Sequence, residues 1–172
     1  TYVSGYENGM WLSRSSVVID SSTITGNSNR GIHIHSDFDY LSRSDTLIYS
    51  TFTGNGTDGI YVEEYGRLIA NYNNIYGNNG YEYRNNSNKW EEIDARHNWW
   101  GENTTVEMNE GSNPKNIDEI YDVYDDNGLG FVNYSGWLDE KDGLPSGSSG
   151  SLGELKLVDA SGGEVLTYDI TD

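Results

Sequence analysis

A pattern of alternating apolar and polar residues recurs along the chain, and each copy is interrupted by a turn rich in Gly and Asn. The copies cover residues 17–35, 47–62 and 68–83, and the second half of each opens with glycine, at Gly31, Gly59 and Gly80. Alternation at period two predicts β-strands, and Gly and Asn predict the turns that separate them. Each copy is therefore predicted to be a strand, a turn and a strand.

The spacing of four asparagines defines the repeat. Each lies three positions after an apolar residue, and successive asparagines are 28, 23 and 25 residues apart. The pairs are Ile24 and Asn27, Phe52 and Asn55, Ile75 and Asn78, and Trp100 and Asn103. A period in the twenties is typical of a solenoid, in which each repeat stacks on the previous one as a rung.

Aligning the copies predicts two interior columns and a polar column at the bend between them. Small polar residues stacked at one bend can hydrogen-bond to the rungs above and below, so we expect a structural ladder there. The interior columns are Ile19, Leu47, Ala70 and Ala95, and Ile24, Phe52, Ile75 and Trp100; the bend column is Ser22, Ser50, Asn73 and Asn98. Asp45 falls in a column that Val17, Leu68 and Ile93 occupy elsewhere, and we interpret it as a frayed strand start.

The segment after the last repeat is predicted to close the solenoid. Asn98, Trp99, Trp100 and Gly101 continue the bend and interior columns, so we expect the two Trp residues to plug the last coil. Asn113-Pro114 is typical of a helix start, and apolar residues then recur every three to four positions, at Ile117, Ile120, Tyr121 and Tyr124. This predicted helix would cover an otherwise open strand edge.

These features together resemble the C-terminal part of right-handed parallel β-helix repeat proteins, which share the pectate-lyase-like superfold. The rungs, the Asn-Trp-Trp-Gly closure and the acidic segment 117–127 carry the resemblance, over about residues 5–140. Such proteins are secreted or surface proteins of archaea and bacteria, and some are described by similarity as periplasmic copper-binding proteins. The resemblance implies an all-β parallel β-helix over residues 1–144 with a short C-terminal capping helix. The fold hosts lyases, hydrolases, adhesins and spacers, so it implies little about function.

Composition narrows the range of partners. The 172 residues suffice for one domain, and the net charge of −18 argues against nucleic acid or an anionic membrane and favours cations or basic surfaces. There is no cysteine, which excludes disulfides and thiolate metal sites, and no apolar run reaches the length of a membrane span.

The C-terminal residues differ in composition from the rungs. Residues 145–153 have the composition of a Gly/Ser linker, and residues 154–172 alternate at period two around a turn, which predicts a β-hairpin. A lone hairpin is marginal in water, so we expect it to dock on its own chain, on a second subunit, or within a larger parent chain. The residues that would mediate assembly are Leu155, Leu157, Val165, Leu166, Tyr168 and Ile170.

Two groups of side chains are candidate metal ligands. His33, His35 and Asp37 alternate along one predicted strand, and two imidazoles with a carboxylate suit zinc or copper; the alternative is a solvated strand face. The carboxylates of Asp122, Asp125 and Asp126 could bind calcium, although no EF-hand pattern surrounds them and a solvated acidic turn is the alternative.

Candidate sites for carbohydrate are of two kinds. Aromatic residues recur on successive rungs and could stack on sugar rings; they are Tyr49, Tyr61, Tyr72, Tyr76, Tyr81, Tyr83 and Trp90. Asparagine sequons, which would carry glycans outside the cell, begin at Asn55, Asn85, Asn103 and Asn133.

The sequence argues against catalysis. The closest combinations of acidic and basic residues are Glu63-Glu64 with Arg67, and Asp94 with Arg96. Polygalacturonases are enzymes that share the β-helix fold, and neither combination matches their catalytic motifs. Our first hypothesis is therefore a non-enzymatic extracellular or cell-surface structural module that polymerises through its C-terminal strands. The alternatives are a carbohydrate-binding or carbohydrate-processing module and, on His33 and His35 alone, a metal-delivery protein.

Overall fold

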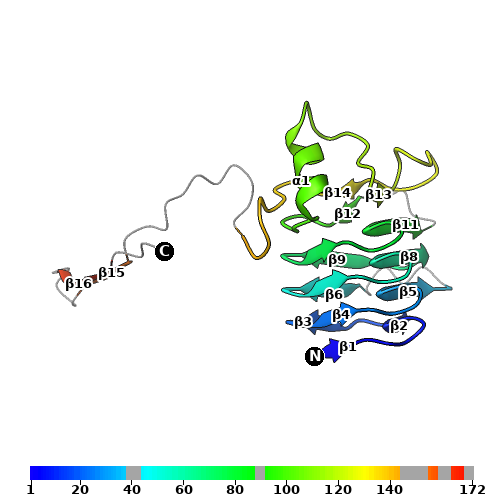
Figure 1. The fold of residues 1–172 in the computed structure, drawn as a ribbon, viewed down its shortest axis with the longest axis horizontal. Helices are drawn as coiled ribbons and strands as arrows, with labels where there is room; N and C mark the ends of the chain where they lie inside the picture. The colour runs from blue at the N-terminus through cyan, green and yellow to red at the C-terminus, as the bar shows by residue number, and fades with distance from the viewer. Residues whose placement is uncertain (38–43, 88–91, 144–154, 159–163, 169–172) are drawn as a thin grey trace.

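The computed structural model describes residues 1–37, 44–87, 92–143, 155–158 and 164–168. Parallel strands form three sheets, which we call A, B and C, and within each sheet the strands stack one above another along one axis (Figure 1). Sheet A contains β1 (Tyr2–Val3), β4 (Thr23–Thr25), β7 (Thr51–Thr53) and β10 (Asn74–Tyr76). Sheet B contains β2 (Met10–Ser13), β5 (Ile32–Ser36), β8 (Ile60–Glu64), β11 (Tyr83–Ser87) and β13 (Ile120–Tyr121). Sheet C contains β3 (Val18–Asp20), β6 (Asp45–Ile48), β9 (Leu68–Asn71), β12 (Ile93–Asp94) and β14 (Val132–Asn133).

The chain visits the sheets in the order C, A, B, so each circuit is one rung of a parallel β-helix. Ile19 pairs with Leu47 and Leu47 with Ala70, as the repeat alignment predicts. All members of both interior columns are buried, and Ile24, Phe52 and Ile75 have no exposed surface. The predicted fold class and core are confirmed.

The bend between sheets C and A carries the predicted polar ladder. The backbone N–H of Ser22 donates to Ser50 Oγ at 3.1 Å, that of Ser50 to Asn73 Oδ1 at 3.0 Å, and that of Asn73 to Asn98 Oδ1 at 2.8 Å. Each buried N–H that has no strand partner at the bend is satisfied by the side chain of the next rung. The ladder therefore couples every rung to the next.

Asp45 is a correction to the sequence interpretation, because it is an ordered part of the rung stack. Its side chain is buried; Oδ1 accepts the backbone N–H of Val17 at 2.9 Å, and Oδ2 accepts the Ser15 hydroxyl at 2.9 Å. The carboxylate therefore replaces packing with hydrogen bonds to the preceding rung.

The predicted capping helix at residues 114–124 is wrong. The helix α1 spans Glu102–Asn109, nearer to the double Trp, and lies at the end of the stack opposite the N-terminus (Figure 1). Residues 117–119 instead form a turn, closed by the Ile120 N–H, which donates to the Ile117 carbonyl at 2.9 Å. The strand β13 follows, and its residues Ile120 and Tyr121 pair with Tyr83 and Arg84. Ile117 and Ile120 are buried as expected, but in a turn and a strand.

The sequence gives little sign of α1. Met108 is its one fully buried apolar side chain, Thr104 and Thr105 supply the rest of its buried face, and Val106 is exposed. The helix therefore begins where the last rung ends, and not where an apolar pattern begins. Gly101, at φ 87°, turns the chain out of the last rung into α1. Trp100 is 1% exposed and plugs the last coil, as predicted.

The predicted C-terminal hairpin is present: β15 (Leu155–Val158) pairs antiparallel with β16 (Glu164–Tyr168). The linker residues 145–153 and Ile170 lie outside the described residues. None of the helices in the described part of the chain has the length and apolar character needed to span a bilayer.

We predict that Asn73→Ala destabilises the fold by about 3 kcal/mol, because it removes the acceptor of a buried N–H together with the side-chain bonds to Leu47 O and Asn98 Oδ1. The measurement is urea unfolding, with Asn79→Ala at an exposed position as the matched control. Equal unfolding midpoints for the two variants would show that the ladder contributes no stability.

Candidate functional site

A pocket of about 400 Å³ lies at the capped end of the β-helix, between the last rung and the start of α1. This volume is within the range of small-molecule sites. We call it the end pocket and define it by its lining residues, which are Tyr76, Gly77, Asn78, Glu82, Trp99, Trp100, Gly101, Glu102, Asn103, Thr104 and Glu119.

A second ladder, of asparagines, leads into the end pocket. Asn27 Nδ2 donates to Asn55 Oδ1 at 2.9 Å, and Asn55 Nδ2 donates to Asn78 Oδ1 at 2.8 Å. Asn78 Nδ2 in turn donates to a carboxylate oxygen of Glu82. The repeat spacing predicts Asn103 as the next member, but Asn103 lies in α1, and Glu82 takes its place at the end of the ladder.

Glu82 occupies a column that is glycine in the earlier rungs. Tyr83 pairs with Ile60, so the third copy is shifted by two residues from the predicted alignment, and Glu82 follows Gly31 and Gly59 in the stack. A Cβ at Gly59 would lie 2.6 Å from Asn78 Nδ2, and one at Gly31 would lie 2.8 Å from Asn55 Nδ2. A side chain fits at Glu82 because no asparagine follows in the next rung.

The carboxyl group of Glu82 is held in an environment that favours its neutral form. It is 4% exposed, and burial, with a smaller contribution from the charge of Glu119, raises its pKa to about 7 against the hydrogen bonds from Asn78. Burial also raises the pKa of Glu119, with further contributions from Asp118 and Glu107. The end pocket therefore contains two carboxyl groups that titrate above their ordinary range.

Aromatic rings form much of the remaining wall. The rings of Tyr76 and Trp99 lie 4.7 Å apart at 53°. The Nε1 atoms of Trp99 and Trp100 have almost no accessible surface and, among the described residues, no hydrogen-bond acceptor. The start of α1 has no side-chain cap, and its residues Glu102, Asn103 and Thr104 line the pocket. The wall combines an apolar platform with amide and carboxyl groups.

The family comparison agrees with this architecture. A family model described as a right handed beta helix region matches residues 2–137. The chain belongs to this family. No match was found among curated proteins or among solved structures. The family establishes the β-helix and its hand, and the end pocket lies within the matched range.

In this β-helix, the predicted metal ligands His33, His35 and Asp37 do lie together, on the outer face of sheet B. His35 Nε2 is 2.5 Å from Asp37 Oδ1, and His33 Nε2 is 2.7 Å from Glu63 Oε1. Burial lowers the pKa of His33, and Trp11 covers its ring at 4.2 Å. Across the described ranges, no three His, Asp or Glu side chains are arranged to hold a metal ion. The imidazoles are paired with carboxylates instead.

Glu63 was missed as the partner of the two histidines. In the repeat alignment it follows Val62 as His35 follows Ile34, and β5 pairs with β8 in that register. The alignment alone could therefore have placed Glu63 beside His35.

The predicted calcium ligands form a turn in which the carboxylates cap backbone N–H groups. Asp122 is buried, and its oxygens accept the N–H of Tyr124 and of Val132, each at 2.9 Å. Asp125 accepts the N–H of Asp122 at 3.1 Å, and Asp126 accepts that of Gly128 at 2.9 Å. These contacts use the oxygens that calcium would need, and the described residues offer no three-ligand group here.

The four sequon asparagines differ in accessibility. Asn55 and Asn85 are fully buried, and their amides donate to Asn78 and to the Gly130 carbonyl. A glycan on either would break the stack, so burial argues against these two predicted positions. Asn103 is exposed and Asn133 is half-buried.

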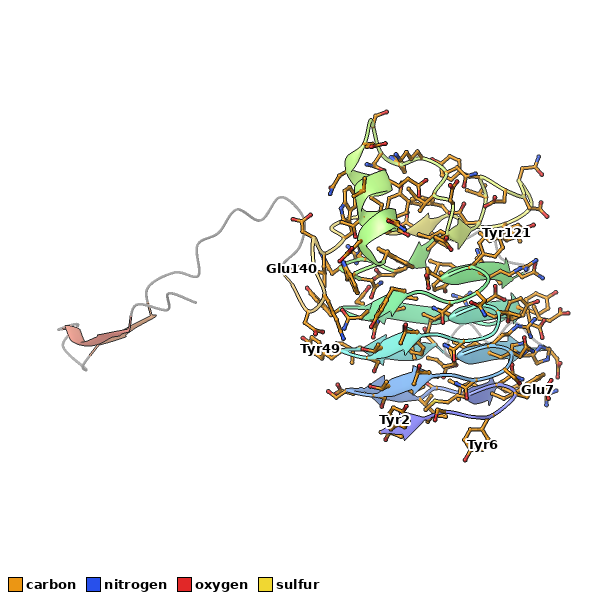
Figure 2. All side chains as sticks on the ribbon, in the orientation of Figure 1. Tyr2, Tyr6, Glu7, Tyr49, Tyr121 and Glu140 are labelled. Atoms are coloured by element: carbon orange, nitrogen blue, oxygen red, sulfur yellow. The ribbon has the colours of Figure 1, made fainter. Side chains whose placement is uncertain are left out.

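The recurring aromatic residues divide between core and surface. Tyr83 is fully buried and Tyr61 is largely so. Tyr49, labelled in Figure 2, and Tyr72 are exposed, and their rings lie 5.8 Å apart. Tyr76 alone of the predicted series lines the end pocket, and Trp90 lies outside the described residues. The pair Asp94 and Arg96 forms a surface ion pair at 2.9 Å and is not part of the pocket.

Glu82 and Glu119 are the pocket residues that sequence reasoning missed. The available signal was the break in the glycine column at Glu82, which the shifted alignment of the third copy concealed. Glu119 carried no local signal, since it reaches the pocket through the turn that replaces the predicted helix.

We predict that Glu82→Gln makes stability less dependent on pH. The pKa of Glu82 rises from its ordinary value of 4.5 to about 7 on folding, so its contribution is intact below pH 4.5 and is lost as the pH rises toward 7. The loss amounts to about 3 kcal/mol above pH 7. Gln keeps the acceptor for Asn78 without the charge, so the variant should match the parent chain at pH 4.5 and exceed it at pH 8. Denaturant unfolding at both pH values tests this, and parallel profiles would contradict it.

Proposed function

We propose that this chain is a non-enzymatic β-helix module of an extracellular or cell-surface protein, and that it binds a sugar unit of a glycan in the end pocket. The observation that carries the proposal is the composition of the pocket wall. The aromatic pair of Tyr76 and Trp99 offers a face for sugar C–H groups, and side-chain amides and carboxyl groups that can bond to hydroxyl groups line the same pocket.

A sugar ring matches this wall because it presents an apolar face and a rim of hydroxyl groups. Each hydroxyl both donates and accepts, so it can bond to the carboxylates and to the side-chain amides of Asn78 and Asn103 together.

The binding role is preferred to hydrolysis despite the two carboxyl groups. Both oxygens of Glu82 accept hydrogen bonds from Asn78, one from the side chain and one from the backbone N–H at 3.4 Å. Glu82 is therefore fixed in position at the end of the asparagine ladder. Each of its oxygens keeps a second lone pair that can accept from a ligand, whereas a general acid would need a proton on an oxygen aimed at the leaving group.

We predict that Tyr76→Ala lowers glycan affinity about tenfold, because it removes one ring of the stacking platform. A glycan array identifies a ligand, and calorimetry then compares the parent chain with the variant. Tyr49→Ala is the matched control, since Tyr49 is 61% exposed in a surface stack outside the pocket (Figure 2). Absence of any glycan ligand, or equal losses in both variants, would refute the proposal; release of reducing sugar by the parent chain would refute the non-enzymatic part.

A structural role with self-association through the C-terminal strands is the second candidate. It is supported by β15 and β16, which form a two-stranded sheet of their own, because such a sheet gains stability by adding to another. Electron microscopy and sedimentation of the full chain test it: filaments support assembly, and a monomer at all concentrations opposes it.

A further inference from the structure

The charge of the end pocket narrows the class of sugar. Three of its eleven lining residues are glutamates, namely Glu82, Glu102 and Glu119, and none is Lys, Arg or His. Lys141 lies 5.8 Å from the centroid of the Tyr76 ring but does not line the pocket. The whole chain carries a net charge of −18, so the surrounding field adds to the local one. Among the described residues that line the pocket, an anionic sugar would meet carboxylates and no cation.

The aromatic wall also favours a cationic ligand. An ammonium group is attracted to the faces of Trp and Tyr rings, and the attraction grows when water is excluded. Tyr76 and Trp99 supply such faces next to the carboxyl groups. The side-chain amides of Asn78 and Asn103, which also line the pocket, can bond to ring and hydroxyl oxygens. A ligand that carries both a cationic nitrogen and sugar oxygens therefore fits this lining.

We propose that the end pocket selects an amino sugar with a free, protonated amino group. This inference rests on the proposed function and specifies its ligand class. The amino group lies against Glu82 and Glu119, and the ring stacks on the Tyr76 and Trp99 wall. A neutral sugar binds the same platform but leaves the carboxylates without a cation.

Binding of an ammonium group is coupled to ionisation of the pocket. Glu82 faces Asn78, whose N–H groups favour the carboxylate, and Glu119, whose charge opposes it. A bound cation favours the ionised form of both glutamates, so ammonium binding releases protons. Since Glu82 titrates near pH 7 in the free protein, affinity for an amino sugar should rise about tenfold from pH 5.0 to 6.8, whereas affinity for a neutral sugar should not rise.

The test is calorimetry of the full chain with glucose, glucosamine and glucuronic acid at pH 5.0 and 6.8. Glucosamine and glucuronic acid each differ from glucose at one carbon. We expect glucosamine to bind at least tenfold more tightly than glucose at pH 6.8, and glucuronic acid to bind most weakly. The double variant Glu82→Gln/Glu119→Gln should lose the preference and its pH dependence while still binding glucose. Glu7→Gln/Glu140→Gln, at two exposed glutamates that do not line the pocket, is the control for net charge (Figure 2).

Each outcome assigns a failure to one claim. Equal affinities for glucosamine and glucose in the parent chain would overturn the amino-sugar inference and leave the proposed function standing. No binding of any of the three sugars, together with no ligand on a glycan array, would overturn both. A glucosamine preference that survives the double variant, in protein whose circular dichroism matches the parent, would overturn the assignment to the end pocket.

Discussion

Hydrogen bonding between successive rungs is the constraint on which the rest of the structure depends. At the bends of a rung, buried backbone N–H groups have no strand partner within the sheets. Each of these N–H groups instead donates to a Ser or Asn side chain of the next rung. Ser50, Asn73 and Asn98 do this at one bend, and Asn27, Asn55 and Asn78 at another. Every rung is thus completed by the one that follows it.

Because each rung depends on the next, the last rung lacks hydrogen-bond acceptors as well as packing partners. The last asparagine of the ladder needs a group that imitates the next rung, and Glu82 supplies a carboxylate where a further asparagine oxygen would lie. Because α1 replaces strands above it, the space beside Glu82 is not filled by a rung and becomes the end pocket. The pocket and the raised pKa of Glu82 have the same origin, namely a buried ladder that stops.

Much of the fold follows from local repetition. The columns of Ile24, Phe52 and Ile75 and the ladder from Ser22 to Asn98 could be predicted because each rung repeats the same residue types at nearly the same spacing. Predictions failed where the repetition stops. The spacing of Ile117, Ile120, Tyr121 and Tyr124 fits a helix and equally a turn and a strand that bury two of the four. The short α1 has too little apolar periodicity to be recognised.

By itself, the sequence determined the architecture, the residues of the core and the face on which His33 and His35 lie, because these depend on neighbours one period away. Tertiary structure alone decided which groups meet where the repeat ends. It turned Asp122 into an acceptor for backbone N–H groups and brought Glu82, Glu119 and Trp99 to one pocket. Contacts of this kind arise where the period breaks, and no local pattern encodes which residues then become neighbours.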